Sequence, residues 1–240
     1  MLAVVVPVLM GACFALLGLT FEYPSVMDLP PGEVLTRLGE AGDGVVATWL
    51  GVLVSAALFL GLVVCLHCVV RAEGGARLPA LTVVTVAGAV AALLMMLDLS
   101  QWVWLYPDLG DRYDDPATAA AARGDLEVTW SAFHRYVGVG IGIYGATLFN
   151  GVWALGMGWA LRASGRRVLW WPALGSGALF LASIAPGVGF GAYGTINGAG
   201  FALWALWLVV VGWTLARRGH LLDVPAGAPG PAAEKSAATP

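Results

Sequence analysis

One carboxylate, Asp98, stands in a stretch that is otherwise apolar enough to cross a membrane, LPALTVVTVAGAVAALLMMLDLSQWVWLY. An aspartate at the centre of a transmembrane helix costs about 2.5–3.5 kcal/mol on insertion scales. Asp98 therefore marks a candidate functional site, as a proton donor, a proton relay or a cation site at the base of an outward-facing cavity. An interhelical hydrogen bond that fixes packing is an equally weighted alternative. Gln101 and Trp102 follow at i+3 and i+4 and share its helix face.

A second group of reactive side chains begins the next apolar segment. Glu127, Trp130 and His134 recur at helical spacing, and an imidazole beside a carboxylate can exchange protons near neutral pH. We expect Asp98, His134 and Glu127 to form a catalytic group, with an interfacial histidine paired to a loop acid as the alternative. The spacing lacks a tight ligand motif, so we expect no metal. We expect no haem or other cofactor either, since His67 belongs at the opposite end of its helix from His134.

Aromatic and amide side chains of the last apolar segment could complete a ligand pocket. Trp204 and Trp207 lie one turn apart, and Asn197 lies two turns before Trp204 on a similar face. Tyr193 opens the same segment. We expect these four residues, with Gln101, Trp102 and Trp130, to bind an apolar or cationic ligand. Simple helix packing is the alternative for each.

The elements that must position these residues are membrane-spanning helices. Hydrophobic residues make up 59% of the 240 residues and charged residues only 11%, whereas soluble domains carry about 25% charged residues. A helix of about 20 apolar residues spans a bilayer. Six apolar segments meet this length, near residues 2–20, 45–70, 81–106, 130–161, 168–185 and 196–215. The prediction is an all-α bundle of six transmembrane helices within residues 1–220.

Two shorter segments complete the predicted organisation. Val34, Leu35 and Leu38 recur at helical spacing after a Pro-Pro pair, which predicts a short surface helix near residues 31–42. Residues 221–240 are small, Pro-rich and polar, and we expect a disordered cytoplasmic tail.

Charge distribution sets the predicted orientation. With both termini cytoplasmic, the inner segments hold most of the basic residues and the outer loops hold most of the acids, as the positive-inside rule requires. The inner basic residues are Arg71, Arg77, Arg162, Arg166, Arg167, Arg217, Arg218 and Lys235. A net charge of −3 gives no indication of nucleic-acid binding, so the expected partner is the lipid bilayer, and a homo-oligomer stays open.

The segment from Tyr106 to Ala160 carries a family resemblance. It contains YPDLGDRYDDPATAAA, then FHRYVGVGIGIYG, then FNGVWALGMGWAL. These motifs resemble those of small six-helix bacterial membrane proteins, frequent in actinobacteria, that are grouped as a domain of unknown function. The resemblance implies the six-helix architecture and a multi-pass location in a bacterial plasma membrane, and it implies no activity.

The residues favour a ligand-handling membrane protein. We expect a small hydrophobic or isoprenoid-like ligand in a cavity open to the outer half of the bilayer. A proton-driven isomerase or cyclase using Asp98 is one form of this hypothesis, because aromatic faces stabilise carbocations; whether the chain is an enzyme stays open. The alternatives are a proton-coupled exporter or self-resistance protein, and a non-catalytic accessory or sensor subunit.

Overall fold

The described residues form an all-helical bundle in a computed structural model, which describes residues 1–72, 80–185 and 190–219. No strand occurs among them. The long helices are α1 (Leu2–Thr20), α3 (Gly42–Ala72), α4 (Ala80–Val103), α7 (Thr147–Ala163), α8 (Trp170–Ser183) and α9 (Phe190–Gly219). The other elements are η1 (Ser25–Asp28), α2 (Pro31–Glu40), α5 (Leu105–Asp114), α6 (Ala120–Phe133), η3 (His134–Ala146) and η4 (Arg167–Leu169).

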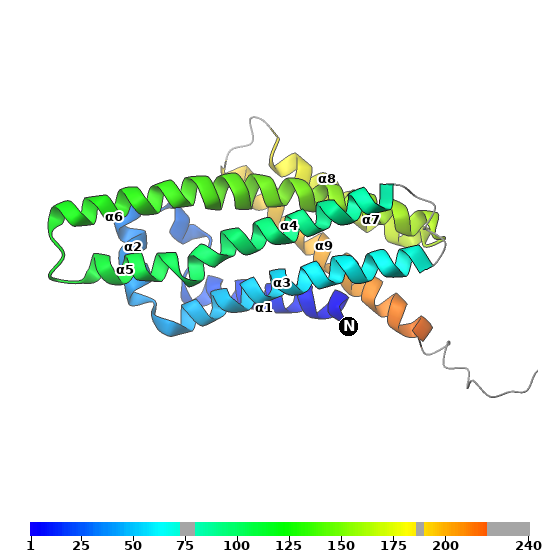
Figure 1. The fold of residues 1–240 in the computed structure, drawn as a ribbon, viewed down its shortest axis with the longest axis horizontal. Coiled ribbons are helices and arrows are strands. Elements are labelled where there is room, and N and C mark those ends of the chain that lie inside the picture. Colours follow the sequence, from blue (N-terminus) through cyan, green and yellow to red (C-terminus); the bar gives the residue numbers. More distant parts are fainter. Residues whose placement is uncertain (73–79, 186–189, 220–240) are drawn as a thin grey trace, which may run out of the picture.

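The six long helices form a closed ring in chain order. Helix α1 packs against α3, α3 against α4, α4 against α7, α7 against α8, α8 against α9, and α9 returns to α1. In Figure 1 the start of α1 and the end of α9 lie at the same end of the bundle. Each neighbouring pair in the chain is thus also a neighbouring pair in space, as expected for helices joined by short connections.

Two helical rods of the bundle each join more than one helical element end to end. Residues Ala120–Ala163 form one continuous helical stretch of 44 residues, which passes through the π-helical segment η3 between α6 and α7. Helix α4 continues into α5 after an interruption at Trp104. Both rods extend beyond the ring at one end, where they meet α2 (Figure 1).

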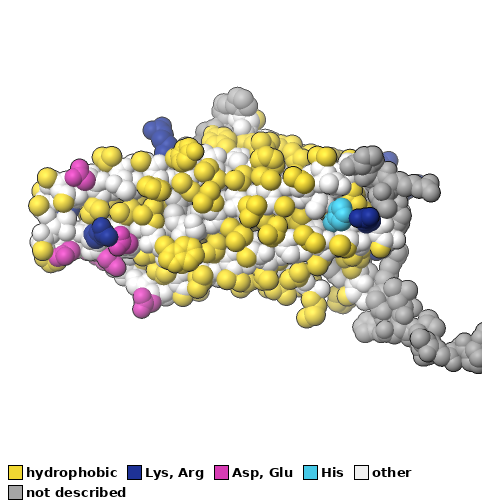
Figure 2. All heavy atoms as spheres, in the orientation of Figure 1, with side chains coloured by type: hydrophobic (Ala, Val, Ile, Leu, Met, Phe, Trp, Pro, Cys, Tyr) yellow, Lys and Arg dark blue, Asp and Glu magenta, His cyan; other side chains and the backbone are white. Residues whose placement is uncertain are grey.

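Helices α2, α5 and α6 form a cap on the bundle, which we call the helical cap. Helix α2 packs against both α5 and α6. A Cβ atom at Gly110 would lie 2.7 Å from the backbone nitrogen of Gly39, so α2 and α5 approach this closely only because position 110 lacks a side chain. In Figure 2, acidic side chains gather at the capped end, while apolar side chains cover the middle of the visible face.

Five of the described helices are long and apolar enough to cross a membrane. They correspond to five of the six predicted segments. The predicted span near residues 168–185 corresponds to η4 and α8, and α8 alone has only 14 residues, or about 21 Å of helix against a hydrocarbon core of about 30 Å. The predicted apolar run is divided here between the 3-10 turn η4 and the shorter helix α8. The predicted tail, residues 221–240, lies outside the described residues.

Two hydrophobic clusters fill the bundle. One, which we call the filled half, includes Phe59, Trp153 and Trp207 and lies toward the uncapped end. The other surrounds Trp49 and Trp102 and extends into the helical cap. We call this second region the hollow half, because a cavity lies within it, next to the filled half.

Candidate functional site

A cavity of about 520 Å³ opens within the ring of helices and brings Asp98 to its wall. Helices α1, α3, α4, α7 and α9 and segment η3 all contribute to its lining, and most of the lining side chains are apolar or aromatic. The polar lining side chains are Tyr23, Asp98, Thr147, Asn150, Tyr193 and Asn197. No lysine, arginine or histidine of the described chain lines it, so Asp98 faces the cavity without a cationic partner there.

A chain of hydrogen bonds orients the Asp98 carboxyl group. The hydroxyl of Tyr106 donates to Oε1 of Gln101 at 2.7 Å, and Nε2 of Gln101 donates to Oδ1 of Asp98 at 2.9 Å. Because Tyr106 holds the amide oxygen of Gln101, the amide NH₂ group must point toward Asp98. The fixed donor therefore sets the orientation of the Asp98 carboxyl group at the cavity wall.

The π-helical segment η3 brings its backbone against Asp98. A Cβ atom at Gly142 would lie 2.3 Å from Cγ of Asp98, a distance that no side chain tolerates. Segment η3 runs for 13 residues, whereas π-helices in proteins are mostly single turns and frequently occur at functional sites. Glycine at position 142 therefore allows η3 to form one wall directly beside the carboxyl group.

Aromatic rings build the wall of the cavity nearest the helical cap. The rings of Trp49 and Trp102 stack with centroids 4.4 Å apart, and the ring of Tyr23 packs edge-on against Trp49 at 5.0 Å. Burial raises the pKa of the Tyr23 hydroxyl above its ordinary value, so this group stays protonated at neutral pH. The wall thus consists of aromatic rings and one neutral hydroxyl.

Amide side chains lie at the part of the cavity next to α7 and α8. Nδ2 of Asn197 lies 3.4 Å from both the Thr147 hydroxyl and the Ser183 hydroxyl, which are long contacts. Asn150 is only 2% exposed, and its Oδ1 atom has no hydrogen-bond partner in the structure. Since a buried unpaired acceptor costs about 1–3 kcal/mol, Asn150 offers a vacant acceptor for a ligand or a water molecule.

The cavity brings together only some of the residues that the sequence suggested. Asp98, Trp102, Tyr193, Asn197 and Trp204 all line it. Gln101, which was also predicted, does not line the cavity but contacts it indirectly through its hydrogen bond to Asp98. The i+3 and i+4 spacing was sufficient to associate Gln101 and Trp102 with Asp98.

Four other predicted residues lie away from the cavity lining. The ring of His134 stacks on Trp130 with centroids 4.9 Å apart, and its Nδ1 atom has no hydrogen-bond partner. Glu127 accepts a hydrogen bond from the hydroxyl of Tyr113 at 2.7 Å, in the helical cap. Trp207 packs against Trp153 in the filled half.

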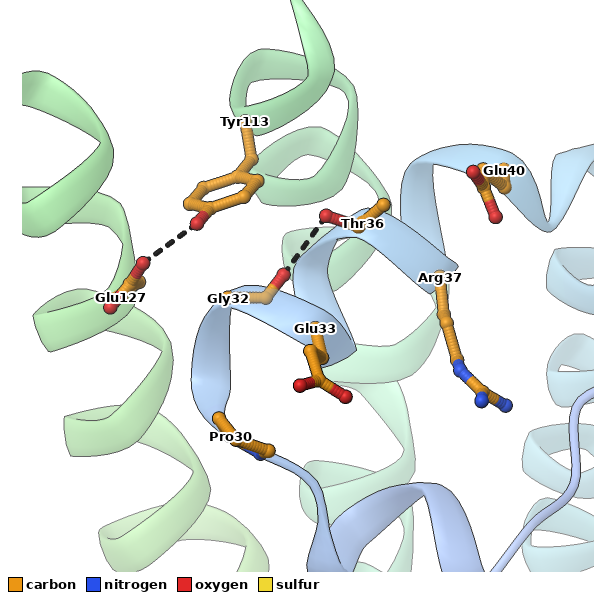
Figure 3. Close-up of a pocket in the computed structure, with 8 residues that line it drawn as sticks. All are labelled: Pro30, Gly32, Glu33, Thr36, Arg37, Glu40, Tyr113 and Glu127. Atoms are coloured by element: carbon orange, nitrogen blue, oxygen red, sulfur yellow. Dashed lines mark hydrogen bonds between the residues drawn. The ribbon is translucent and has the colours of Figure 1, made fainter. Parts of the chain in front are cut away.

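Glu127 instead lines an open groove on the helical cap. Figure 3 shows the Tyr113 hydroxyl directed at Glu127, with the carboxyl groups of Glu33 and Glu40 on the facing helix α2. Arg37, which also lines the groove, pairs with Glu22. The structure therefore separates Glu127 from Asp98 and gives it a bonding partner of its own.

Three further lining residues, Tyr23, Trp49 and Asn150, carried weak signals in the sequence. Trp49 lies near one end of its apolar segment, where tryptophan is common at a membrane interface. A single amide such as Asn150 is typical of a hydrogen bond between packed helices, and Tyr23 lies in a loop with no periodicity. Only the fold of the loop after α1 places Tyr23 against Trp49. Across the described residues, no three His, Cys, Asp or Glu side chains come together in a way that could hold a metal ion.

A family model described as "Domain of unknown function (DUF4386)" matches residues 2–212. The chain belongs to this family. The predicted resemblance to such a family is thereby confirmed. Neither the curated proteins nor the solved structures include a match to the chain. The DUF4386 match includes α9 as far as residue 212, the other five helices of the ring, and every residue that lines the cavity, so the candidate site lies within the family's domain.

Proposed function

We propose that this membrane protein holds a small hydrophobic or isoprenoid-like ligand in the cavity and that Asp98 acts on it. One observation carries the proposal, namely that Asp98 lines a largely apolar cavity of about 520 Å³. Ligand sites in proteins commonly measure about 300–1,000 Å³ and combine apolar walls with a few placed polar groups. An intramembrane acid that faces such a space is suited to a ligand rather than to helix packing alone.

The chemistry that fits these groups is proton transfer to and from a carbon–carbon double bond. The Asp98 carboxyl proton adds to one alkene carbon through the π electron pair, which leaves a cation on the other carbon. The faces of Trp49 and Trp102 stabilise that cation, and the Gln101 amide stabilises the new carboxylate. Loss of a proton from a neighbouring carbon back to Asp98 shifts the double bond and restores the acid, which is an isomerisation.

We also propose six membrane crossings with both termini cytoplasmic, in a bacterial plasma membrane. The closed ring supports six crossings, because α8 occupies one of the six positions in it. Support for the orientation comes from the acidic helical cap at one end and the positive-inside rule. The start of α1 and the end of α9 lie together at the opposite end (Figure 1).

The test compares Asp98→Asn with Ser100→Ala, a change on the same helix at a residue that lines neither the cavity nor the groove. Lipid-soluble metabolites are extracted from cells expressing each variant and compared by mass spectrometry, and the thermal stability of each purified protein is measured. We expect wild type and Ser100→Ala to change the metabolite profile and Asp98→Asn to lose that change. Asparagine can still accept the hydrogen bond from Gln101, so the variant should stay folded.

Other outcomes identify the competing functions. A proton-coupled exporter is indicated if wild type leaves the metabolite profile unchanged but alters drug tolerance or proton flux. Asp98→Asn should then abolish that alteration. A lower melting temperature for Asp98→Asn with no change in either readout indicates that Asp98 is a packing residue and contradicts the proposal.

A further inference from the structure

The gap between α1 and α9 is the feature of the cavity that bears on how a ligand enters. At the uncapped end the two helices touch, because a Cβ atom at Gly212 would lie 3.1 Å from Cβ of Ala3. Farther along, Gly11 of α1 and Gly194 and Gly198 of α9 all line the cavity. A Cβ atom at any of these three glycines would meet no atom within 4 Å. The helices are therefore in contact at one end and separated at the level of the cavity.

These glycines are also exposed on the outside of the bundle. Gly11, Gly194 and Gly198 are each exposed while lining the cavity, as is Ala202 one turn farther along α9. The neighbouring outer surface is apolar, with Val8 57% and Leu206 60% exposed. An opening flanked by exposed apolar side chains on spanning helices faces lipid rather than water.

The polar groups of the cavity bear on which ligand it accepts. Oδ1 of Asn150 is a buried acceptor without a partner, and Asp98 has one carboxyl oxygen bonded to Gln101. No cationic side chain of the described chain lines the cavity. An available acceptor on Asn150 and no cation favour a ligand that brings a hydrogen-bond donor and disfavour one that brings a carboxylate.

From these contacts we infer that the cavity opens sideways to the bilayer between α1 and α9, at Gly11, Gly194 and Gly198. The inference rests on the proposed function and names its ligand class, a linear amphiphile whose head group is a hydrogen-bond donor, as in a long-chain alcohol or amine. Such a molecule partitions into the bilayer and enters through the opening without crossing water. Its chain packs along the aromatic wall, and its donor reaches Asn150.

The test uses the full chain in phosphatidylcholine vesicles and a photoreactive hexadecanol as the probe. Illumination at increasing times after probe addition gives an initial rate and a plateau of labelling for peptides that line the cavity. In the combined variant Gly11→Leu and Gly198→Leu, two side chains fill the opening while the remaining walls stay intact. We expect the initial rate to fall about tenfold and the plateau to change less than about twofold, since closing an entrance slows association and dissociation together.

A matched control separates closure of the opening from the effect of adding leucine to a helix. Gly124 lies on α6, where a Cβ atom also meets nothing within 4 Å, and it does not line the cavity. Gly124→Leu should leave both rate and plateau unchanged. If the combined variant labels as fast as Gly124→Leu, the lateral opening is overturned while binding in the cavity still stands.

The head-group requirement has its own comparison. Photoreactive hexadecanol and hexadecylamine carry a donor, whereas the methyl ester of the same chain carries none and the free acid carries a negative charge. We expect plateau labelling of the cavity to be several-fold higher with the alcohol or the amine, and Asn150→Leu to reduce that preference. Equal labelling by the ester overturns the donor requirement. Absence of cavity labelling by all four probes overturns the proposed function as well.

Discussion

The two halves of the bundle differ in whether side chains fill the space between the helices. In the filled half a Cβ atom at Gly88 would lie 2.3 Å from Cδ1 of Trp153, and one at Gly156 would lie 2.2 Å from Cγ2 of Val84. In the hollow half a Cβ atom at Gly11 would meet nothing within 4 Å. Glycines occur in the helices of both halves, and Gly142 of the hollow half also allows a close approach, to Asp98, so the presence of glycines alone does not distinguish a packed core from a binding cavity.

The arrangement of tryptophans explains part of this difference. Trp153 inserts between helices and meets Phe59 edge-on with centroids 5.0 Å apart, so it fills space between α3, α4 and α7. Trp49 and Trp102 stack on each other and both line the cavity. The same residue type therefore closes one half and lines an open space in the other.

Removing the central ring of the filled half should have the largest effect on stability. Trp153 is fully buried, and replacement of a buried tryptophan by alanine costs about 3–5 kcal/mol through lost contacts and a residual cavity. We expect Trp153→Ala to lower the thermal midpoint of the purified protein strongly. Trp213→Ala, at a ring that is 58% exposed, is the control and should change stability by less than about 0.5 kcal/mol. Similar losses for both variants would remove the distinction between the filled half and the surface.

Adding one methyl group at a glycine should have opposite effects in the two halves. Gly88→Ala forces the Trp153 ring to move, and overpacking of this kind costs about 1–3 kcal/mol. Gly11→Ala meets no neighbour, and alanine is favoured over glycine within a helix by about 0.5–1 kcal/mol. Denaturant unfolding in mixed micelles measures both free energies. A loss of stability at both positions would show that the space beside Gly11 is occupied.

Part of this organisation was accessible from the sequence, and the reason is periodicity. Gln101 and Trp102 were associated with Asp98 because an α-helix places i+3 and i+4 on one face. His134 was expected to join them, but it begins the π-helical segment η3. The i→i+5 bonding of a π-helix changes which residues share a face, and Gly142 rather than His134 meets Asp98.

The remaining errors in the predicted site come from tertiary contacts. Trp204 and Trp207 lie one turn apart and were both expected as walls, and both belong to the filled half, but only Trp204 also lines the cavity. Glu127 was expected near Asp98 because it recurs at helical spacing with His134, and nothing in the sequence indicated that Tyr113 would bind it. Helix periodicity gives a residue's face, but the neighbouring helix determines what that face contacts.

A smaller effect is expected from breaking the hydrogen-bond chain that orients Asp98. In Tyr106→Phe the aromatic packing against Trp102 is retained, and the donor to Gln101 is lost. A typical hydrogen bond contributes about 0.5–1.5 kcal/mol to stability, so the thermal midpoint should fall modestly. The Gln101 amide is then free to rotate, so cavity labelling by hexadecanol should fall more than the loss of stability explains. Unchanged labelling would mean that Gln101 does not need Tyr106 to face Asp98.

The smallest effect is expected in the helical cap, and it tests whether the hollow half ends beneath it. Tyr113→Phe removes the hydrogen bond to Glu127 at a partly exposed position, where the loss of stability should not exceed about 1 kcal/mol. Glu127→Gln keeps an acceptor for that hydroxyl and should cost less still. Because Glu127 lines the groove and not the cavity, neither variant should change cavity labelling or the metabolite profile. A loss of either readout in Glu127→Gln, with stability intact, would extend the functional site from Asp98 into the helical cap and would make the catalytic group predicted from the sequence correct.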